Sequence, residues 1–190
     1  MDVEKFYVEV LHITEKQLVK NLINITEPLQ LRKGEILIHE GEVQDHFSFM
    51  TDGILRGFFL DANGRDVTDC FGFRCGTPAM SCLTSGTPAL FTIEALTDCS
   101  FLQLEGNALL NLMRKNPELL WIYNRLLQDA FRSHWEIKTI VCQNTAMKRY
   151  QWFLEKYPGL IDKVSNKHIA SFLGMTPVTL SRLRRILREE

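Results

Sequence analysis

Residues 165–185 run SNKHIASFLGMTPVTLSRLRR and predict two short helices joined by a tight turn. Ser165 can cap the first helix, because its hydroxyl can accept a hydrogen bond from a free amide of the first turn. Gly174 can end that helix, because glycine adopts the left-handed conformation without steric cost. Thr176 and Pro177 can begin the second helix as its cap and first helical residue. Small or apolar side chains are spaced for packing between the helices, namely Ile169, Ala170, Leu173, Met175, Leu180 and Leu183.

This helix pair has the pattern of a helix-turn-helix, whose second helix enters the major groove of DNA. An arginine can bind guanine through two hydrogen bonds, and a threonine can contact a phosphate or a thymine methyl group. The alternative is an ordinary helical hairpin, which has no need of basic and hydroxyl side chains on its outer face. The residues predicted to contact DNA are Lys167, Thr176, Thr179, Ser181, Arg182 and Arg185.

The composition is typical of a soluble globular protein, with 45% apolar and 24% charged residues. No apolar run reaches the about 18 residues of a membrane span, and the amino terminus lacks a secretory apolar segment. We therefore expect a cytoplasmic protein with no membrane partner. The net charge of −1 hides a basic segment, because from Thr145 onward nine Lys and Arg stand against four Asp and Glu. Such a basic module suits contact with phosphates.

The five cysteines are an odd number, which favours free thiols in a cytoplasmic chain. The spacing of Cys70, Cys75 and Cys82 matches no standard zinc or iron–sulfur motif, so we expect no metal site. The sequence contains no nucleophile elbow, zinc-protease motif or phosphate-binding loop. We therefore expect the protein not to be an enzyme.

The hydrophobic period predicts an α+β chain in which a short helix precedes a run of strands and further helices follow them. Thr14 begins a capping-box pattern for a helix that continues to Asn24. From Pro28 onward, apolar residues alternate with polar ones in short segments separated by turn-forming pairs, of which Asn63-Gly64 is the strongest. Both residues of that pair tolerate the positive φ of a tight hairpin. Many short strands at regular spacing indicate a sandwich or a barrel.

Helical periodicity returns after Glu105, and helices are expected at residues 107–114, 118–143 and 145–157. The long middle helix has an apolar seam at alternating steps of three and four, which suits a homodimer interface. It also has apolar residues off this seam, so we expect one face on the β domain and one on a partner. The seam comprises Leu120, Tyr123, Leu127, Ala130, His134, Ile137 and Val141, and the residues off it are Leu119, Ile122, Leu126, Phe131 and Trp135.

This order of segments resembles the Crp/Fnr family of bacterial transcription regulators over essentially the whole chain. The resemblance is carried by Lys33-Gly34-Glu35, Glu40-Gly41, residues 52–56 (DGILR), residues 88–95 (PALFTIEA) and the predicted helix-turn-helix. It implies three regions and three partners. The regions are a double-stranded β-helix (jelly-roll) domain at 1–116, a dimerisation helix at 117–144 and a helix-turn-helix domain at 145–190. The partners are double-stranded DNA, a second copy of the chain and RNA polymerase. Because the sequence stops at Glu190, we expect the usual β wing to be absent.

Members of this family that bind a cyclic nucleotide carry a phosphate cassette, in which an arginine neutralises the cyclic phosphate and a glutamate holds the ribose. Aligning this chain on Pro88 and Ala95 places Ala89 at the arginine position, so a cyclic phosphate would lack its charge-assisted partner. We therefore expect no cyclic AMP or cyclic GMP cofactor, and the roll to hold another small effector or none. The degenerate effector pocket comprises Met80, Ser81, Cys82, Ala89 and Leu90.

The helix-turn-helix also departs from the family, because Pro177-Val178 replace the Arg-Glu pair that often opens the second helix. Arg182 matches the base-contacting arginine that follows, and Thr176 and Thr179 match phosphate-contacting positions. The resemblance as a whole implies a homodimeric DNA-binding transcription regulator. The alternative is a small-molecule sensor or a binding module with little or no DNA-binding activity, which a gel shift would distinguish.

Overall fold

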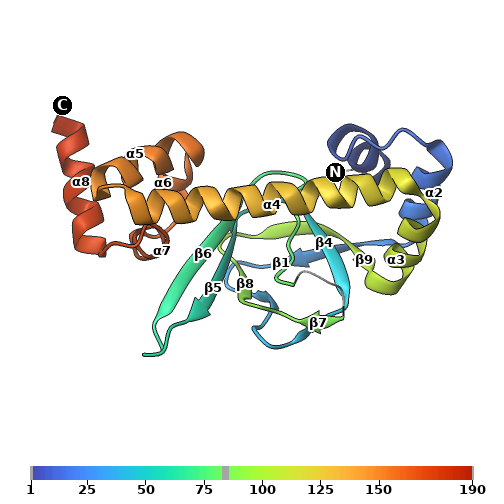
Figure 1. Cartoon of the computed structure of the whole chain (residues 1–190), viewed down its shortest axis with the longest axis horizontal. Helices are drawn as coiled ribbons and strands as arrows, with labels where there is room; N and C mark the ends of the chain where they lie inside the picture. The colour runs from blue at the N-terminus through green and yellow to red at the C-terminus, as the bar shows by residue number, and fades with distance from the viewer. Residues whose placement is uncertain (1, 83–85, 190) are drawn as a thin grey trace. The chain divides into compact units, whose positions relative to one another are not determined.

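A computed structural model describes residues 2–82 and 86–189, and Figure 1 labels most of its helices and strands. Contacts within the chain group it into two units. The three domain ranges expected from the sequence stay a prediction. The first unit comprises Met1–Phe59 and Cys70–Gln128, and the second comprises Leu60–Asp69 and Asp129–Glu190.

The described residues form nine short strands. A three-stranded sheet has the order β1-β9-β4, a four-stranded sheet has the order β2-β8-β5-β6, and β3 pairs with β7. None of these described sheets closes into a barrel, and the roll confirms the predicted α+β fold class. The strands are β1 (Thr26–Leu31), β2 (Ile36–Ile38), β3 (Val43–Gln44), β4 (His46–Asp52), β5 (Leu55–Leu60), β6 (Asp66–Gly72), β7 (Thr87–Pro88), β8 (Thr92–Ala95) and β9 (Cys99–Glu105).

The helices expected after the strands are present, and their ends lie within about two residues of the predicted ones. In the part of the chain that the structure describes, no helix has the length and apolar character needed to cross a membrane. The helices are α1 (Val3–Lys5), the π-helix η1 (Phe6–Val10), α2 (Lys16–Asn24), α3 (Gly106–Lys115), α4 (Pro117–Gln143), α5 (Ala146–Lys156), α6 (Leu160–Lys163), α7 (Asn166–Phe172) and α8 (Pro177–Glu189).

Strands β4 and β9 have buried side chains on both faces. Successive residues of a strand point to opposite sides, so neighbouring residues of each strand can pack in different clusters. Phe49 and Leu102 belong to an apolar cluster that also contains residues of the N-terminal helices, of α3 and of the first half of α4. Met50 and Phe101 belong to a second cluster inside the roll, together with Ile93 of β8. The core of the first unit therefore lies on both sides of the β1-β9-β4 sheet.

The predicted capping box at Thr14 does not form. Helix α2 begins at Lys16 after Glu15, whose side chain makes no capping hydrogen bond. Thr14 instead donates hydrogen bonds from its backbone amide and its hydroxyl to Glu118 Oε1, at 2.9 and 2.8 Å. The bond from the Thr14 amide is the largest cause that lowers the pKa of Glu118 below its ordinary value. The capping-box prediction was wrong because the Thr14 amide and hydroxyl bind the carboxylate of Glu118, which is distant in sequence.

The β5–β6 hairpin turns with one positive φ rather than two. Gly64 has a φ of 72°, whereas Asn63 does not have a positive φ. The Asp61 carboxylate accepts hydrogen bonds from the amides of Arg65 and Asn63, at 2.9 and 2.8 Å, and these bonds lower the pKa of Asp61. The turn predicted at Asn63-Gly64 is therefore present, and Asp61 organises it as a longer turn than the two-residue hairpin type.

The second unit has an aromatic core. The ring centroids of Phe153 and Tyr157 lie 5.1 Å apart, and those of Tyr157 and Phe172 lie 5.4 Å apart. Glu136, in the second half of α4, accepts hydrogen bonds from Lys156 Nζ at 2.8 Å and from Trp152 Nε1 at 3.0 Å. The bond from Lys156 is the main cause that lowers the pKa of Glu136. These bonds connect α4 to α5, which packs beside the α7–α8 pair.

Candidate nucleic-acid interface and roll interior

The helices α7 and α8 are capped as the local sequence predicts. The Ser165 hydroxyl accepts a hydrogen bond from the amide of His168 at 3.3 Å, and the Thr176 hydroxyl accepts one from the amide of Thr179 at 3.1 Å. Pro177 is the first residue of α8, where its missing amide hydrogen has no cost. The side chains between the two helices are buried, with Ile169, Ala170, Leu173 and Leu180 at 0% exposure and Leu183 at 9%.

The turn between α7 and α8 is held by Arg149 of α5. Gly174 has a φ of 61°, as its predicted position after α7 requires. Arg149 Nη1 donates hydrogen bonds to the carbonyl oxygens of Leu173 and Gly174, at 2.7 and 3.1 Å. A Cβ added to Gly174 would lie 3.1 Å from Arg149 Nη1 and 3.1 Å from Val141 Cγ1. Both the backbone conformation and the available space therefore favour glycine at this turn.

The outer face of α8 carries three of the six residues predicted to contact DNA, namely Ser181, Arg182 and Arg185. Side chains three, four and seven positions apart lie on one side of a helix, so positions 178, 181, 182 and 185 share a face. Lys167 lies separately, on the first turn of α7. Of the predicted residues, Lys167, Thr176, Ser181, Arg182 and Arg185 are exposed and Thr179 is half-buried.

Two further residues of α8 have properties that were not predicted. Arg184 Nη1 donates a hydrogen bond to Asn166 Oδ1 at 2.7 Å, and Arg184 Nη2 lies 3.9 Å from Asp162 Oδ1. This arginine therefore connects the helices of the unit and is not a candidate DNA contact. Val178 is 70% exposed, more than any other large apolar residue in the described ranges. In the sequence, this exposed valine was marked only by Pro177-Val178 standing where the resembled family often has an Arg-Glu pair.

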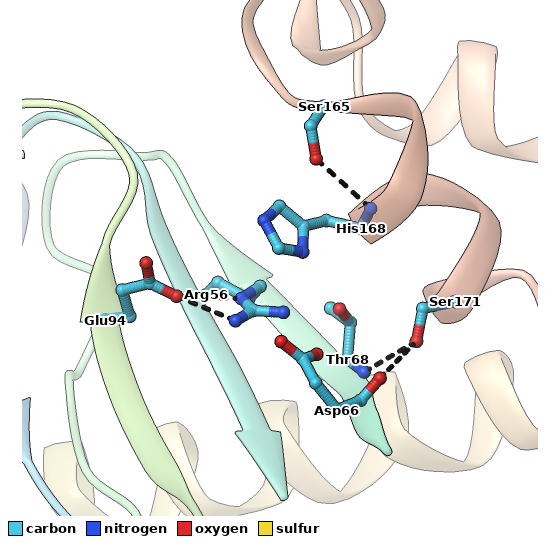
Figure 2. Close-up of polar contacts among 7 residues, drawn as sticks. All are labelled: Arg56, Asp66, Thr68, Glu94, Ser165, His168 and Ser171. Atoms are coloured by element: carbon cyan, nitrogen blue, oxygen red, sulfur yellow. Dashed lines mark hydrogen bonds and ion pairs between the residues drawn. The ribbon is translucent and has the colours of Figure 1, made fainter. Parts of the chain in front are cut away.

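A hydroxyl of α7 binds the tip of the β5–β6 hairpin, which belongs to the same unit (Figure 2). Ser171 Oγ accepts a hydrogen bond from the amide of Thr68 at 2.9 Å and donates one to the carbonyl oxygen of Asp66 at 3.4 Å. Strand β6 is the last strand of its sheet, so these backbone groups lie on an edge. No local sequence pattern signals this contact, because Ser171 and Thr68 are 103 positions apart.

The residues of the predicted effector pocket do not share one lining. Ala89 is 3% exposed and belongs to the apolar cluster inside the roll, whereas Leu90 is 62% exposed. Ser81 and Cys82 are buried, and the half-buried Met80 packs against the other apolar cluster. The amide of Leu90 donates a hydrogen bond to the carbonyl oxygen of Ser81 at 2.7 Å, which joins the two segments. Residues 83–85, between these segments, lie outside the described residues.

Gln44 of β3 organises the same segments, a role that was not predicted. Its Nε2 donates a hydrogen bond to the carbonyl oxygen of Ala79 at 3.1 Å, and its Oε1 accepts one from the amide of Ser81 at 2.9 Å. Gln44 is 5% exposed, so the hydrogen bonds of these two buried backbone groups are made by a neutral side-chain amide and not by a charged group. The segment aligned with the cassette is therefore held by uncharged hydrogen bonds.

A buried ion pair lies between β5 and β8 (Figure 2). Arg56 donates hydrogen bonds from Nη2 and Nε to Glu94 Oε2, at 2.7 and 3.1 Å, and the arginine side chain is 3% exposed. The two residues face each other in the strand register. The guanidinium carbon also lies 4.1 Å from the centroid of the Phe58 ring. Breaking a buried ion pair is costly, so a phosphate would have to compete with Glu94 for this cation.

The apolar residues of α4 divide between the core and the surface. Tyr123, placed on the predicted seam, packs edge-on against Phe47 with ring centroids 5.9 Å apart. Phe131 and Trp135, two of the apolar residues off the predicted seam, are 67% and 48% exposed. Leu119, Ile122 and Leu126 pack in the core, as expected. Of the other seam residues, Leu120, Ala130 and His134 are exposed, and Leu127, Ile137 and Val141 are half-buried.

The cysteines and other metal-binding side chains are dispersed. Within residues 2–82 and 86–189, no group of three or more His, Cys, Asp or Glu side chains is arranged to hold a metal ion. The cysteines are free thiols. Burial raises the pKa of Cys75 and of Cys99, which keeps both thiols protonated and less reactive.

Most strands of the first unit lie within a segment that matches a known domain family. Residues 28–116 match the family of cyclic nucleotide-binding domains, a range that begins in β1 and ends just after α3. No curated protein matches the chain in sequence.

Comparison with solved structures extends the likeness beyond the roll. FixK2 from Bradyrhizobium japonicum matches with a TM-score of 0.79 and 20% identity, over 87% of this chain and 85% of that chain. The c-di-GMP responsive global regulator CLP from Xanthomonas campestris matches with a TM-score of 0.74 and 11% identity, over 92% of both chains. A protein described as a Crp/Fnr family regulator, from Eubacterium rectale, matches with a TM-score of 0.71 and 21% identity, over 96% of this chain and 87% of that chain. Identities this low establish a shared fold.

Proposed function

We propose that this chain, which has the fold of the Crp/Fnr family of transcription regulators, is a homodimeric cytoplasmic regulator without enzymatic activity. It binds double-stranded DNA through α7 and α8 as a helix-turn-helix. The observation that carries this proposal is that α8 has one buried apolar face and one exposed polar face. Leu180 and Leu183 are 0% and 9% exposed on one side, while Ser181, Arg182 and Arg185 are exposed on the other. A short helix with a buried face on its neighbour and a basic face toward solvent is suited to a major groove.

The candidate DNA contacts divide by position. The N-terminal half of a recognition helix faces base edges, so Arg182 is the residue assigned to a guanine. Lys167, on α7, and Arg185, later on α8, are assigned to phosphates, which bind basic side chains without regard to sequence. Thr176 and Thr179 lie where the helix begins, and their hydroxyls are 2.9 Å apart. The backbone amides of a helix start also favour a phosphate.

The second copy of the chain is proposed to bind along α4. Leu120, Leu127 and His134 are spaced seven apart, and Phe131 lies between the last two on the same side of the helix. Phe131 is 67% exposed in the single chain, and Trp135 beside it is 48% exposed, with their ring centroids 6.2 Å apart. Large exposed aromatic side chains are enriched in interfaces. A symmetric dimer would present two recognition helices to two half-sites.

The roll is proposed to act without cyclic AMP or cyclic GMP. Ala89 contributes no cation where the cassette arginine is expected, and Arg56 is already bound to Glu94 at 2.7 Å. Another small effector is compatible with the fold. RNA polymerase is the partner that a DNA-bound regulator of this fold would contact.

Selection of DNA from a pool of random duplexes tests the proposed function. The full chain should enrich one sequence, and fluorescence anisotropy should show at least about a thousandfold preference for it over a scrambled duplex. Affinity should fall steeply as salt rises, because bound phosphates release counterions. A pool that stays random after repeated selection would rule out specific DNA binding and leave a sensor or a binding module.

A further inference from the structure

Val178 is an apolar side chain that the fold leaves mostly in solvent. It is 70% exposed, whereas Leu180 and Leu183 of the same helix are 0% and 9% exposed. Scattered exposed apolar residues are common and by themselves mean little. Val178, however, shares its helix face with Ser181, Arg182 and Arg185, which are exposed polar residues. It is therefore the apolar member of the face proposed to enter the major groove.

The start of α8 holds Val178 in a defined position. The Thr176 hydroxyl caps the helix through the amide of Thr179, and the two threonine hydroxyls are 2.9 Å apart. Pro177 precedes Val178 as the first residue of α8, and its ring fixes its own φ near the helical value. A valine in a helix also has one strongly preferred rotamer, so its methyl groups lose little freedom on binding. Val178 thus presents a rigid apolar surface at the end of the helix that faces base edges.

We infer that Val178 recognises a thymine through its C5-methyl group, an inference that rests on the proposed function. In the major groove, thymine is the base that presents an apolar group, and the other base edges present hydrogen-bond donors and acceptors. The valine side chain cannot form a hydrogen bond. At the base that it contacts, it would favour thymine by burying the methyl group, and it would disfavour other bases by leaving their donors and acceptors without a partner. Arg182, one turn later, then contacts a guanine a short distance from that thymine.

The test uses the full chain and the duplex that it selects from a random pool. Each thymine of that duplex is replaced in turn by deoxyuridine, which removes the methyl group and keeps Watson–Crick pairing. Binding is measured for the natural chain and for Val178→Ala, with Ile186→Ala as the control. Ile186 is also an exposed apolar residue of α8, at 37%, but it lies two turns further along the helix. Thermal unfolding by circular dichroism verifies that each variant folds.

At one thymine position, the effect of deoxyuridine on binding should depend on whether residue 178 is valine. There, deoxyuridine should weaken binding by the natural chain about fourfold, the effect of one buried methyl group. The same replacement should have no effect on Val178→Ala and an undiminished effect on Ile186→Ala. If a sequence is selected but no thymine couples to Val178, the inference is wrong and the proposed function stands. If no sequence is selected, both are wrong.

Discussion

The Ser171 hydroxyl accepts a hydrogen bond from the backbone amide of Thr68 at 2.9 Å. It also donates to the carbonyl oxygen of Asp66, so one side chain of α7 bridges two backbone groups on the edge of β6. Thr68 is 4% exposed, and a buried amide that loses a hydrogen bond cannot replace it fully with water. The hairpin tip and α7 therefore form one folded unit.

Ser171→Ala should destabilise this unit. The substitution removes both hydrogen bonds, and the expected cost is about 1–3 kcal/mol in urea unfolding. Hydrogen exchange provides a local measurement, since the amide of Thr68 should exchange faster. Ser133→Ala is the control, because Ser133 is exposed on α4 and its replacement should change stability by less than about 0.5 kcal/mol. Unchanged exchange at Thr68 would show that the bond contributes nothing in solution.

Gly174→Ala should be more costly than Gly159→Ala. Both glycines have a positive φ, of 61° and 78°, so both substitutions carry the about 1–2 kcal/mol cost of a left-handed residue. At Gly159 an added Cβ meets nothing within 4 Å, whereas at Gly174 it lies 3.1 Å from Arg149 Nη1. Displacing that guanidinium weakens its bonds to the turn carbonyls, for about 1 kcal/mol more. Equal losses in urea unfolding for the two variants would mean that Arg149 adjusts freely.

Local features were predictable from the sequence, and contacts between distant segments were not. Ser165, Gly174 and Thr176 act within a few residues of themselves, so helix capping rules located them. The capping box failed at Thr14 because Glu118, 104 positions away, binds that threonine. The Ser171–Thr68 bond is equally long-range, and no periodicity signals it.

The same limit applies to α4 and to the roll. Periodicity identified the apolar residues of α4, but not which of them the β domain would cover. In the roll, the absence of a cassette arginine was visible in the sequence, whereas the Arg56–Glu94 pair depends on the register of β5 with β8. Register is a property of the folded sheet, and neither residue is marked by a local pattern.

Phe131→Asp should dissociate the proposed dimer while leaving the protomer folded. Phe131 is 67% exposed in the single chain, so the new carboxylate would be buried only in the dimer. An unpaired buried charge should cost about 3–5 kcal/mol of association, which sedimentation equilibrium would detect. Ser133→Asp, an exposed position on another face of α4, should leave association unchanged. A Phe131→Asp protein that keeps the natural mass in solution would place the interface elsewhere.

Calorimetry with cyclic AMP and cyclic GMP should detect no binding tighter than about 1 mM. The physical reason is that Ala89 supplies no charge, while the buried Arg56 is paired with Glu94 at 2.7 Å. Micromolar binding would contradict this expectation. Arg56→Gln and Arg74→Gln would then identify the cation, since Arg74 is exposed and only the loss of the responsible arginine should abolish binding.

Arg182→Ala and Lys167→Ala should weaken DNA binding in different ways. Arg182 is exposed on the α8 face assigned to base edges, so its loss should cost about 1–3 kcal/mol on the selected duplex and little on a scrambled one. Lys167 is exposed on α7 and is assigned to phosphate, so its loss should weaken both duplexes alike. It should also reduce the salt slope by about one unit.

Lys163→Ala is the matched control for this pair, because Lys163 is an exposed lysine of the same unit in α6, outside the proposed contact face. It should change neither duplex, apart from a small long-range effect at low salt. Equal weakening of both duplexes by Arg182→Ala would make Arg182 a backbone contact and transfer base recognition to another residue of α8. If Arg182→Ala and Lys167→Ala both left binding unchanged on every duplex, the basic surface of α7 and α8 would not be the DNA-binding surface, because a base contact and a phosphate contact cannot both be lost without a loss of affinity.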